Sequence, residues 1–107
     1  MKTQTDFSKD TLYVRLKGAV DHHSAKFMRE EIDREIYKYQ PSTVIMDLSA
    51  VEFMDSSGLG LILGRYTKVN MLGGVLKVAN PTERIEDMLL MAGTDKLIPI
   101  EKGVKFV

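Results

Sequence analysis

The chain has 107 residues, of which 44% are hydrophobic and 28% are charged, proportions ordinary for one globular core. Fifteen basic and fifteen acidic residues cancel, which argues against nucleic acid or an anionic membrane as the main partner. The absence of cysteine excludes disulfides and thiolate chemistry. No apolar run approaches the roughly 20 residues that span a bilayer, and no signal-peptide core is present. We therefore expect a cytoplasmic protein with one domain, residues 1–107.

The first part of the chain predicts a hairpin followed by a helix. Residues 2–7 suit a polar edge strand, and residues 12–17 alternate apolar and polar side chains, as in a half-buried strand that Gly18 ends. Asp21 can cap the helix that follows, and Pro41 stops it. The expected apolar face of this helix is Ala25, Met28, Ile32, Ile36 and Tyr39.

The second part alternates strands and helices. Residues 44–48 are nearly all apolar, which is typical of a central strand, and the helix after them ends at Gly73-Gly74. Residues 75–79 form the next strand, Asn80 caps a third helix, and residues 97–100 form a last strand whose proline places it at a sheet edge. The expected apolar faces are Leu59, Ile62, Leu63, Tyr66 and Val69 in the second helix and Ile85, Met88, Leu89 and Ala92 in the third.

The predicted order is β-β-α-β-α-β-α-β, an α/β fold with four to five strands and about three helices. Strands joined through helices imply a mostly parallel sheet, to which the hairpin adds an antiparallel pair. Functional groups in such sheets gather beyond the carboxyl ends of the strands. Two connections of this kind, residues 18–23 and 49–57, lead to helix N-termini at the same edge, so we expect them to form one surface.

Two hydroxyl groups lie where the second helix begins. Asp55 is suited to the N-cap, which puts Ser56 and Ser57 at the first two helical positions, beside the positive end of the helix dipole. A phosphate there is stabilised by the dipole and by free N–H groups, so this position suits a phosphoserine switch. Helix capping alone is the alternative explanation. Gly58 and Gly60 permit close packing or the close approach of a partner.

Spacing argues against several other kinds of site. No glycine lies two residues before Ser56 or Ser57, so neither serine fits a nucleophile elbow, and a hydrolase would lack a recognisable triad. There is no P-loop, and the glycines after these serines miss the dinucleotide fingerprint by one residue. His22 and His23 are adjacent, so they cannot share a helix face as metal ligands, and no third ligand is apparent. We expect no metal and no cofactor.

The Asp-His-His of residues 21–23 and the long motif of residues 53–66 strongly resemble the STAS-domain anti-sigma factor antagonists, above all the sporulation members. The resemblance covers nearly the whole chain. It implies that Ser57, the second serine of Asp-Ser-Ser-Gly, is the phosphoacceptor. It also implies a partner that is both an anti-sigma factor and a serine kinase. The unmodified antagonist binds this partner and frees the sigma factor, ATP-dependent phosphorylation ends the association, and a PP2C-type serine phosphatase resets the switch.

The same resemblance implies a partner surface made of Asp21, His22, Asp55, Ser56, Ser57, Gly58 and Gly60. Phosphorylation would add about −1.5 to −2 charges, with Asp21 and Asp55 near the new anion. Arg65 suits either charge balance or partner contact. Sporulation members usually carry a final amphipathic helix, whereas residues 101–107 allow only a turn or a tail, which could expose part of the sheet or the third helix. A nucleotide- or small-ligand-binding STAS module without phospho-switching is the alternative function.

Overall fold

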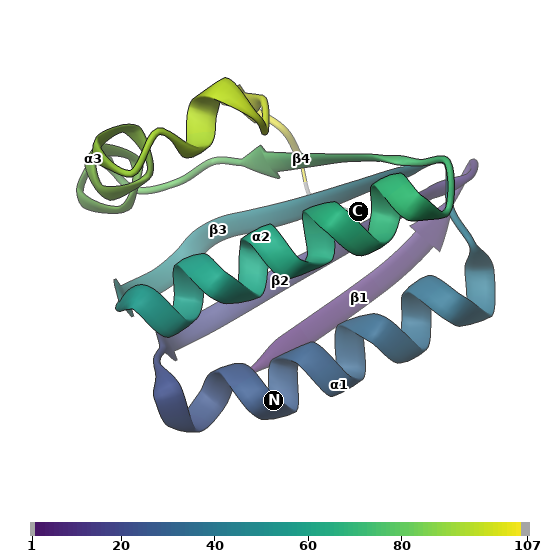
Figure 1. Ribbon diagram of the computed structural model, residues 1–107, viewed down its shortest axis with the longest axis horizontal. Coiled ribbons are helices and arrows are strands. Elements are labelled where there is room, and N and C mark those ends of the chain that lie inside the picture. Colours follow the sequence, from purple (N-terminus) through teal and green to yellow (C-terminus); the bar gives the residue numbers. More distant parts are fainter. Residues whose placement is uncertain (1, 106–107) are drawn as a thin grey trace.

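The computed structural model describes residues 2–105 and places their helices and strands in the expected alternation (Figure 1). The elements are β1 (Thr3–Ser8), β2 (Thr11–Val20), α1 (His22–Tyr39), β3 (Thr43–Met54), α2 (Ser56–Met71), β4 (Val75–Ala79), α3 (Glu83–Met91), the 3₁₀ turn η1 (Thr94–Lys96) and β5 (Ile100–Glu101). The sheet order is β1-β2-β3-β4-β5, with β1 antiparallel to β2 and the remaining neighbours parallel. The predicted α/β fold with a mixed, mostly parallel sheet is confirmed.

The helices α1 and α2 lie side by side over one face of the sheet, and α3 lies near its β4 edge (Figure 1). The core forms where the apolar side of each helix meets the sheet, because burial of apolar surface drives this packing. Fully or almost fully buried members are Leu12, Val14 and Leu16 of β2, Met28, Ile32 and Ile36 of α1, Val44, Met46 and Leu48 of β3, and Ile62 of α2. No helix within residues 2–105 has the length and apolar character needed to cross a membrane.

Two strands are longer than the sequence suggested. The strand predicted to end at Gly18 continues to Val20, because Gly18 adopts a φ of +78° beside shifts in the β2–β3 register, and the strand bends instead of stopping. Similarly, β3 extends to Met54. The expected loops 18–23 and 49–57 are therefore strand up to Val20 and Met54 and helix from His22 and Ser56. A single residue, Asp21 or Asp55, joins each strand to its helix.

The C-terminal third also differs from the prediction. The N-cap of α3 is Thr82, whose hydroxyl accepts from the N–H of Ile85, and not Asn80. Asn80 has a φ of +54°, and its side chain pairs with both the N–H and the C=O of Val104. The last strand comprises only Ile100–Glu101, although its edge position is as predicted. A polar side chain thus ties the segment after β5 to the end of β4.

The buried faces of the helices differ in part from the expected ones, because some apolar side chains expected in the core are exposed. In α2, Leu61 and Arg65 are buried, whereas Leu63 is 37% exposed. This helix faces α1 as well as the sheet, which turns its buried side toward α1. The expected core residue Tyr39 is 36% exposed and stacks on Phe7 instead. Exposed apolar residues around the third helix are Leu90, Met91, Ala92 and Leu97, while Phe106 and Val107 of the predicted tail lie outside the described residues.

Candidate functional site: the two strand-to-helix junctions and the groove between the helices

The two junctions lie next to each other at one edge of the sheet. Val20 and Met54, the last residues of β2 and β3, are paired in the parallel ladder, so the residues after them emerge together. The N–H of Asp55 donates to the C=O of Val20 at 3.3 Å, which joins the second junction to the first. The expectation that both helix N-termini occupy one edge is confirmed.

The first junction is closed by reciprocal capping. The carboxylate of Asp21 accepts from the N–H groups of His23 and Ser24, each at 3.0 Å. The hydroxyl of Ser24 accepts from the N–H of Asp21 at 3.0 Å and donates to the C=O of Ala19 at 2.7 Å. The hydrogen bond from the Ser24 N–H is the main cause that lowers the pKa of Asp21. This network fixes the start of α1.

The second junction is capped on one side only. The carboxylate of Asp55 accepts from the N–H of Ser57 at 2.8 Å and from that of Gly58 at 3.3 Å. Glycine at this third helical position has no side chain to bond back to the cap. Ser56 is exposed and Ser57 is half-buried, and no group within residues 2–105 hydrogen-bonds to the Ser57 hydroxyl. That hydroxyl is held in place through its backbone while its oxygen stays available.

The two glycines near Ser57 have different surroundings. Gly58 is buried, and a Cβ there would clash with the Met54 side chain and lie 2.8 Å from the C=O of Val20. Gly60 is exposed, and a Cβ there would meet no atom within 4 Å. Internal packing of the junctions accounts for Gly58, whereas Gly60 leaves an open surface beside Ser57.

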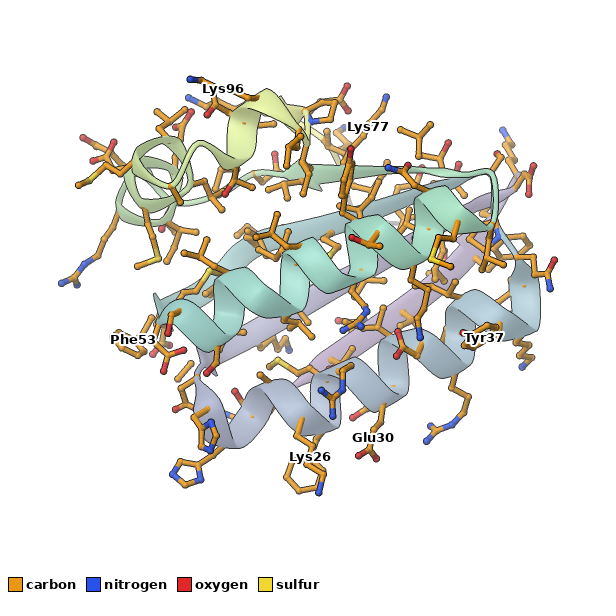
Figure 2. The ribbon with its side chains drawn as sticks, in the orientation of Figure 1. Lys26, Glu30, Tyr37, Phe53, Lys77 and Lys96 are labelled. Atoms are coloured by element: carbon orange, nitrogen blue, oxygen red, sulfur yellow. The ribbon has the colours of Figure 1, made fainter. Side chains whose placement is uncertain are left out.

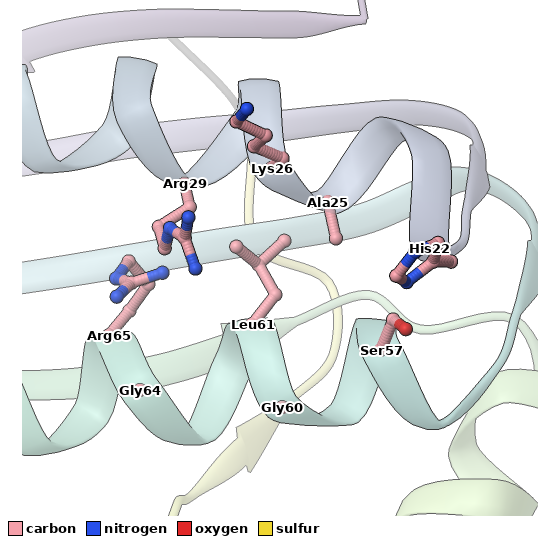
Figure 3. A pocket seen from close by; sticks show the side chains of 9 residues that line it. All are labelled: His22, Ala25, Lys26, Arg29, Ser57, Gly60, Leu61, Gly64 and Arg65. Carbon is pink, nitrogen blue, oxygen red and sulfur yellow. The ribbon is translucent and has the colours of Figure 1, made fainter.

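A groove of about 550 Å³ runs between α1 and α2 and begins at Ser57 (Figure 3). Its lining residues are His22, Ala25, Lys26, Arg29, Ser57, Gly60, Leu61, Gly64 and Arg65. His22 lies opposite Ser57 at one end, while Arg29 and Arg65 lie opposite each other at the other end (Figure 3). Among the described residues, the ionisable side chains of this lining are His22, Lys26, Arg29 and Arg65, with no carboxylate among them, and we call it the basic groove.

Arg65 connects the two helices beneath this groove. It is only 5% exposed, and its Nε lies 2.8 Å from Oδ1 of Asp33, an ion pair without the alignment of a hydrogen bond. Asp33 also accepts from Lys68 at 3.2 Å. Burial lowers the pKa of Arg65, and Asp33 opposes that shift. The Nη1 atom has no hydrogen-bond partner within residues 2–105. Arg65 therefore balances Asp33, and its unpaired Nη1 is covered from solvent.

The structure gathers most of the predicted site residues at this edge and adds two. Lys26 and Arg29 were missed by the sequence reasoning, although their spacing of four and seven from His22 places them on one helix face. That spacing was the available signal. His22 and His23 are exposed with ring centroids 5.9 Å apart, and no three potential metal ligands cluster in the described part of the chain.

Comparison with known proteins gives the class of this chain. It belongs to the STAS domain family, whose profile matches residues 2–106. It is 36% identical over 100 residues to the anti-sigma F factor antagonist of Paenibacillus polymyxa, covering 94% of this chain and 86% of that protein.

Solved structures agree with this assignment. The anti-sigma factor antagonist SpoIIAA in its unphosphorylated form superposes with a TM-score of 0.83 at 27% identity, over 96% of this chain and 89% of the other. Bacillus SpoIIAA in the phosphorylated form gives 0.76 at 27% identity, over 96% and 92%. The family and fold inferred from the two motifs are confirmed.

Proposed function

We propose that this chain is an anti-sigma factor antagonist that switches partners through phosphorylation of Ser57. In its unmodified form it binds an anti-sigma factor that is also a serine kinase, which releases the sigma factor. Phosphorylation from ATP ends this binding, and a PP2C-type serine phosphatase restores it. The chain acts in the cytoplasm as a substrate and binding partner and performs no catalysis itself.

The observation that carries this proposal is the position of the Ser57 hydroxyl. It lies in the first turn of α2, where Asp55 accepts from the Ser57 N–H at 2.8 Å and no described group occupies the oxygen. Phosphoryl transfer needs a hydroxyl oxygen that is fixed and accessible. That oxygen forms the new bond to the γ-phosphorus, the bond from phosphorus to ADP breaks, and the hydroxyl proton passes to a base on the kinase. The similarity to antagonists of anti-sigma factors supplies the class of partner.

The proposed partner surface surrounds this hydroxyl. It comprises Asp21, His22, Asp55, Ser56, Ser57, Gly58 and Gly60. The cap carboxylates of Asp21 and Asp55 are already engaged by backbone N–H groups, and Gly58 is buried. These three residues shape the surface, while His22, Ser56 and Gly60 are exposed and available for contact.

Intact-mass spectrometry after incubation with an anti-sigma factor kinase and ATP tests the proposal. We expect a gain of one phosphate, about 80 Da, in the wild type and in Ser56→Ala but not in Ser57→Ala. Ser57→Ala should still bind the kinase. A gain that persists in Ser57→Ala would place the phosphoacceptor elsewhere and contradict the proposal.

The basic groove favours a second candidate function, a STAS module that binds an anionic small ligand such as a nucleotide. Its volume and the cationic Lys26 and Arg29 in its lining suit an anion. Calorimetry with ATP and GTP on the isolated chain separates the two functions. A tight complex that Arg29→Ala weakens, together with no phosphate gain, would favour the ligand-binding module.

A further inference from the structure

Ser57 shares its groove with side chains that attract anions. His22 and Lys26 lie one helical turn apart on α1 and both line the groove, with His22 opposite Ser57 and the Lys26 ammonium turned away from α2 (Figure 3), and Arg29 follows another turn on. Arg65 adds a buried guanidinium whose Nη1 has no partner within residues 2–105. This guanidinium lies beneath the groove, where Asp33 offsets its charge. The groove is therefore built to accept negative charge.

The carboxylates near this groove are already engaged. Asp55 and Asp21 accept backbone N–H groups at their helix starts, and Asp33 is paired with Arg65 and Lys68. A phosphate on Ser57 would lie near the capping carboxylates of Asp21 and Asp55, which are already engaged, and near the cationic lining of α1. The new anion, expected near Asp21 and Asp55, would thus also lie beside the cationic side chains of α1.

We propose that the phosphate on Ser57 is held by the basic groove of the same chain, through His22 and Lys26 of α1. This inference rests on the proposed function, because it concerns the modified serine. His22 lies directly opposite Ser57 (Figure 3). Lys26 is exposed, and its flexible stem lets the ammonium group turn toward the phosphate. Arg29 and Arg65 add positive potential from the far end, and the cavity of about 550 Å³ has room for the group with bound water.

This capture gives phosphorylation a second effect beyond added charge. An unmodified groove presents Lys26 and Arg29 to a partner, whereas in a phosphorylated groove the phosphate offsets their charge and occupies part of the space. The partner then loses the attraction of the groove as well as space above Gly60. Ejection of the partner would follow from occupation of its own contact surface.

Phosphoserine encoded at position 57 during synthesis tests this without any kinase. A ³¹P NMR titration should give an apparent second phosphate pKa lower than the ordinary value of about 6 by roughly half a unit, because nearby cations favour the dianion. Lys26→Glu and His22→Gln should each raise that pKa toward or above 6. The ring resonances of His22 should also move when Ser57 is replaced by phosphoserine.

Lys96→Glu is the matched control, since it makes the same charge change on η1, far from α1 (Figure 2). It should leave the phosphate pKa unchanged. Amide spectra of β3 confirm that each variant is folded. If Lys26→Glu and His22→Gln behave like Lys96→Glu, or the His22 ring does not respond, the capture is wrong. Because no kinase is used, a failure of the proposed phosphorylation in the kinase assay would not produce that result.

Discussion

The two strand-to-helix junctions have the same plan but are tied down to different degrees. Each consists of one aspartate between a strand and a helix, and each aspartate accepts from the second and third N–H groups of its helix. In α1 the third position is Ser24, which bonds back to the cap and to Ala19. In α2 the third position is Gly58, which makes no such bond. We call the Asp21 junction the closed junction, because the third helical residue hydrogen-bonds back to its cap. We call the Asp55 junction the lean junction, because its third helical residue makes no such bond.

This difference gives the two junctions different structural roles. The lean junction has no side chain at Gly58 because the C=O of Val20 and the side chain of Met54 occupy that space. The C=O of Val20, just before the first junction, thus packs against Gly58 and accepts from the N–H of Asp55. As a result, Ser57 gains a fixed backbone from its neighbours without losing its hydroxyl to an internal hydrogen bond.

The largest effect should come from adding charge to the lean junction. Ser57→Asp should weaken binding to the anti-sigma factor roughly a hundredfold, because the added carboxylate must lose its hydration when the partner packs over position 57. His23→Asp makes the matched change at the same helical position of α1 and should change affinity much less. Calorimetry on both variants decides this, and equal losses would mean that the two junctions contribute alike.

A methyl group at the contact between the junctions should have the next largest effect. Gly58→Ala should lower the free energy of unfolding by about 1–3 kcal/mol, since the added Cβ has no room. Gly60→Ala, two residues along the same helix, should be neutral or stabilising by up to about 1 kcal/mol. Urea denaturation measures both. A Gly60→Ala variant as unstable as Gly58→Ala would contradict the packing argument.

Removing the cap of the lean junction should have a smaller effect. Asp55→Ala should cost about 1 kcal/mol of stability, because two backbone N–H groups lose their acceptor. Asp55→Asn keeps an acceptor and should retain most of that stability. Thermal or urea unfolding of the pair tests whether capping or charge fixes the helix start.

The smallest effect should appear on acidification of the closed junction. The pKa of Asp21 is lowered from its ordinary value of 3.8, so its charged form is favoured in the folded state. Its contribution is complete above that value and is lost as the pH falls through the lower, folded-state pKa. Asp21→Asn should therefore flatten the loss of stability below about pH 4. An unchanged slope in urea titrations would contradict this assignment.

The aspartate-capped helix starts were predictable because capping depends on local chemistry. Asp21 and Asp55 each precede a helical pattern, which places Ser56 and Ser57 at the first two helical positions, as observed. The bend at Gly18 was misread, because a glycine with positive φ can either end a strand or bend it. Only the paired neighbour β3 decides between these outcomes.

The basic groove could not be predicted from the sequence alone, because it forms only where two helices meet in the fold. Its cations come from α1 and α2, and a sequence does not state which faces of two helices will meet. Arg65 was especially hidden, because a charged residue interrupts the apolar pattern that marks a buried face, and only Asp33 on the other helix makes its burial tolerable. Similarly, Asn80 and Thr82 both suit a helix cap. The Asn80 side chain hydrogen-bonds to Val104 instead, and Thr82 caps α3.

The length of β3 has a consequence for when the switch can operate. Its first half is flanked by β2 and β4, so its amide hydrogens should be among the slowest in the chain to exchange with solvent. Ser57 follows the end of this strand by three residues. The Ser57 backbone follows the half of β3 that pairs with β2 alone, and the cap carboxylate of Asp55 holds it there. Under the proposed function, a kinase and a phosphatase would act on the Ser57 hydroxyl in the intact fold, because Ser57 lines the open groove.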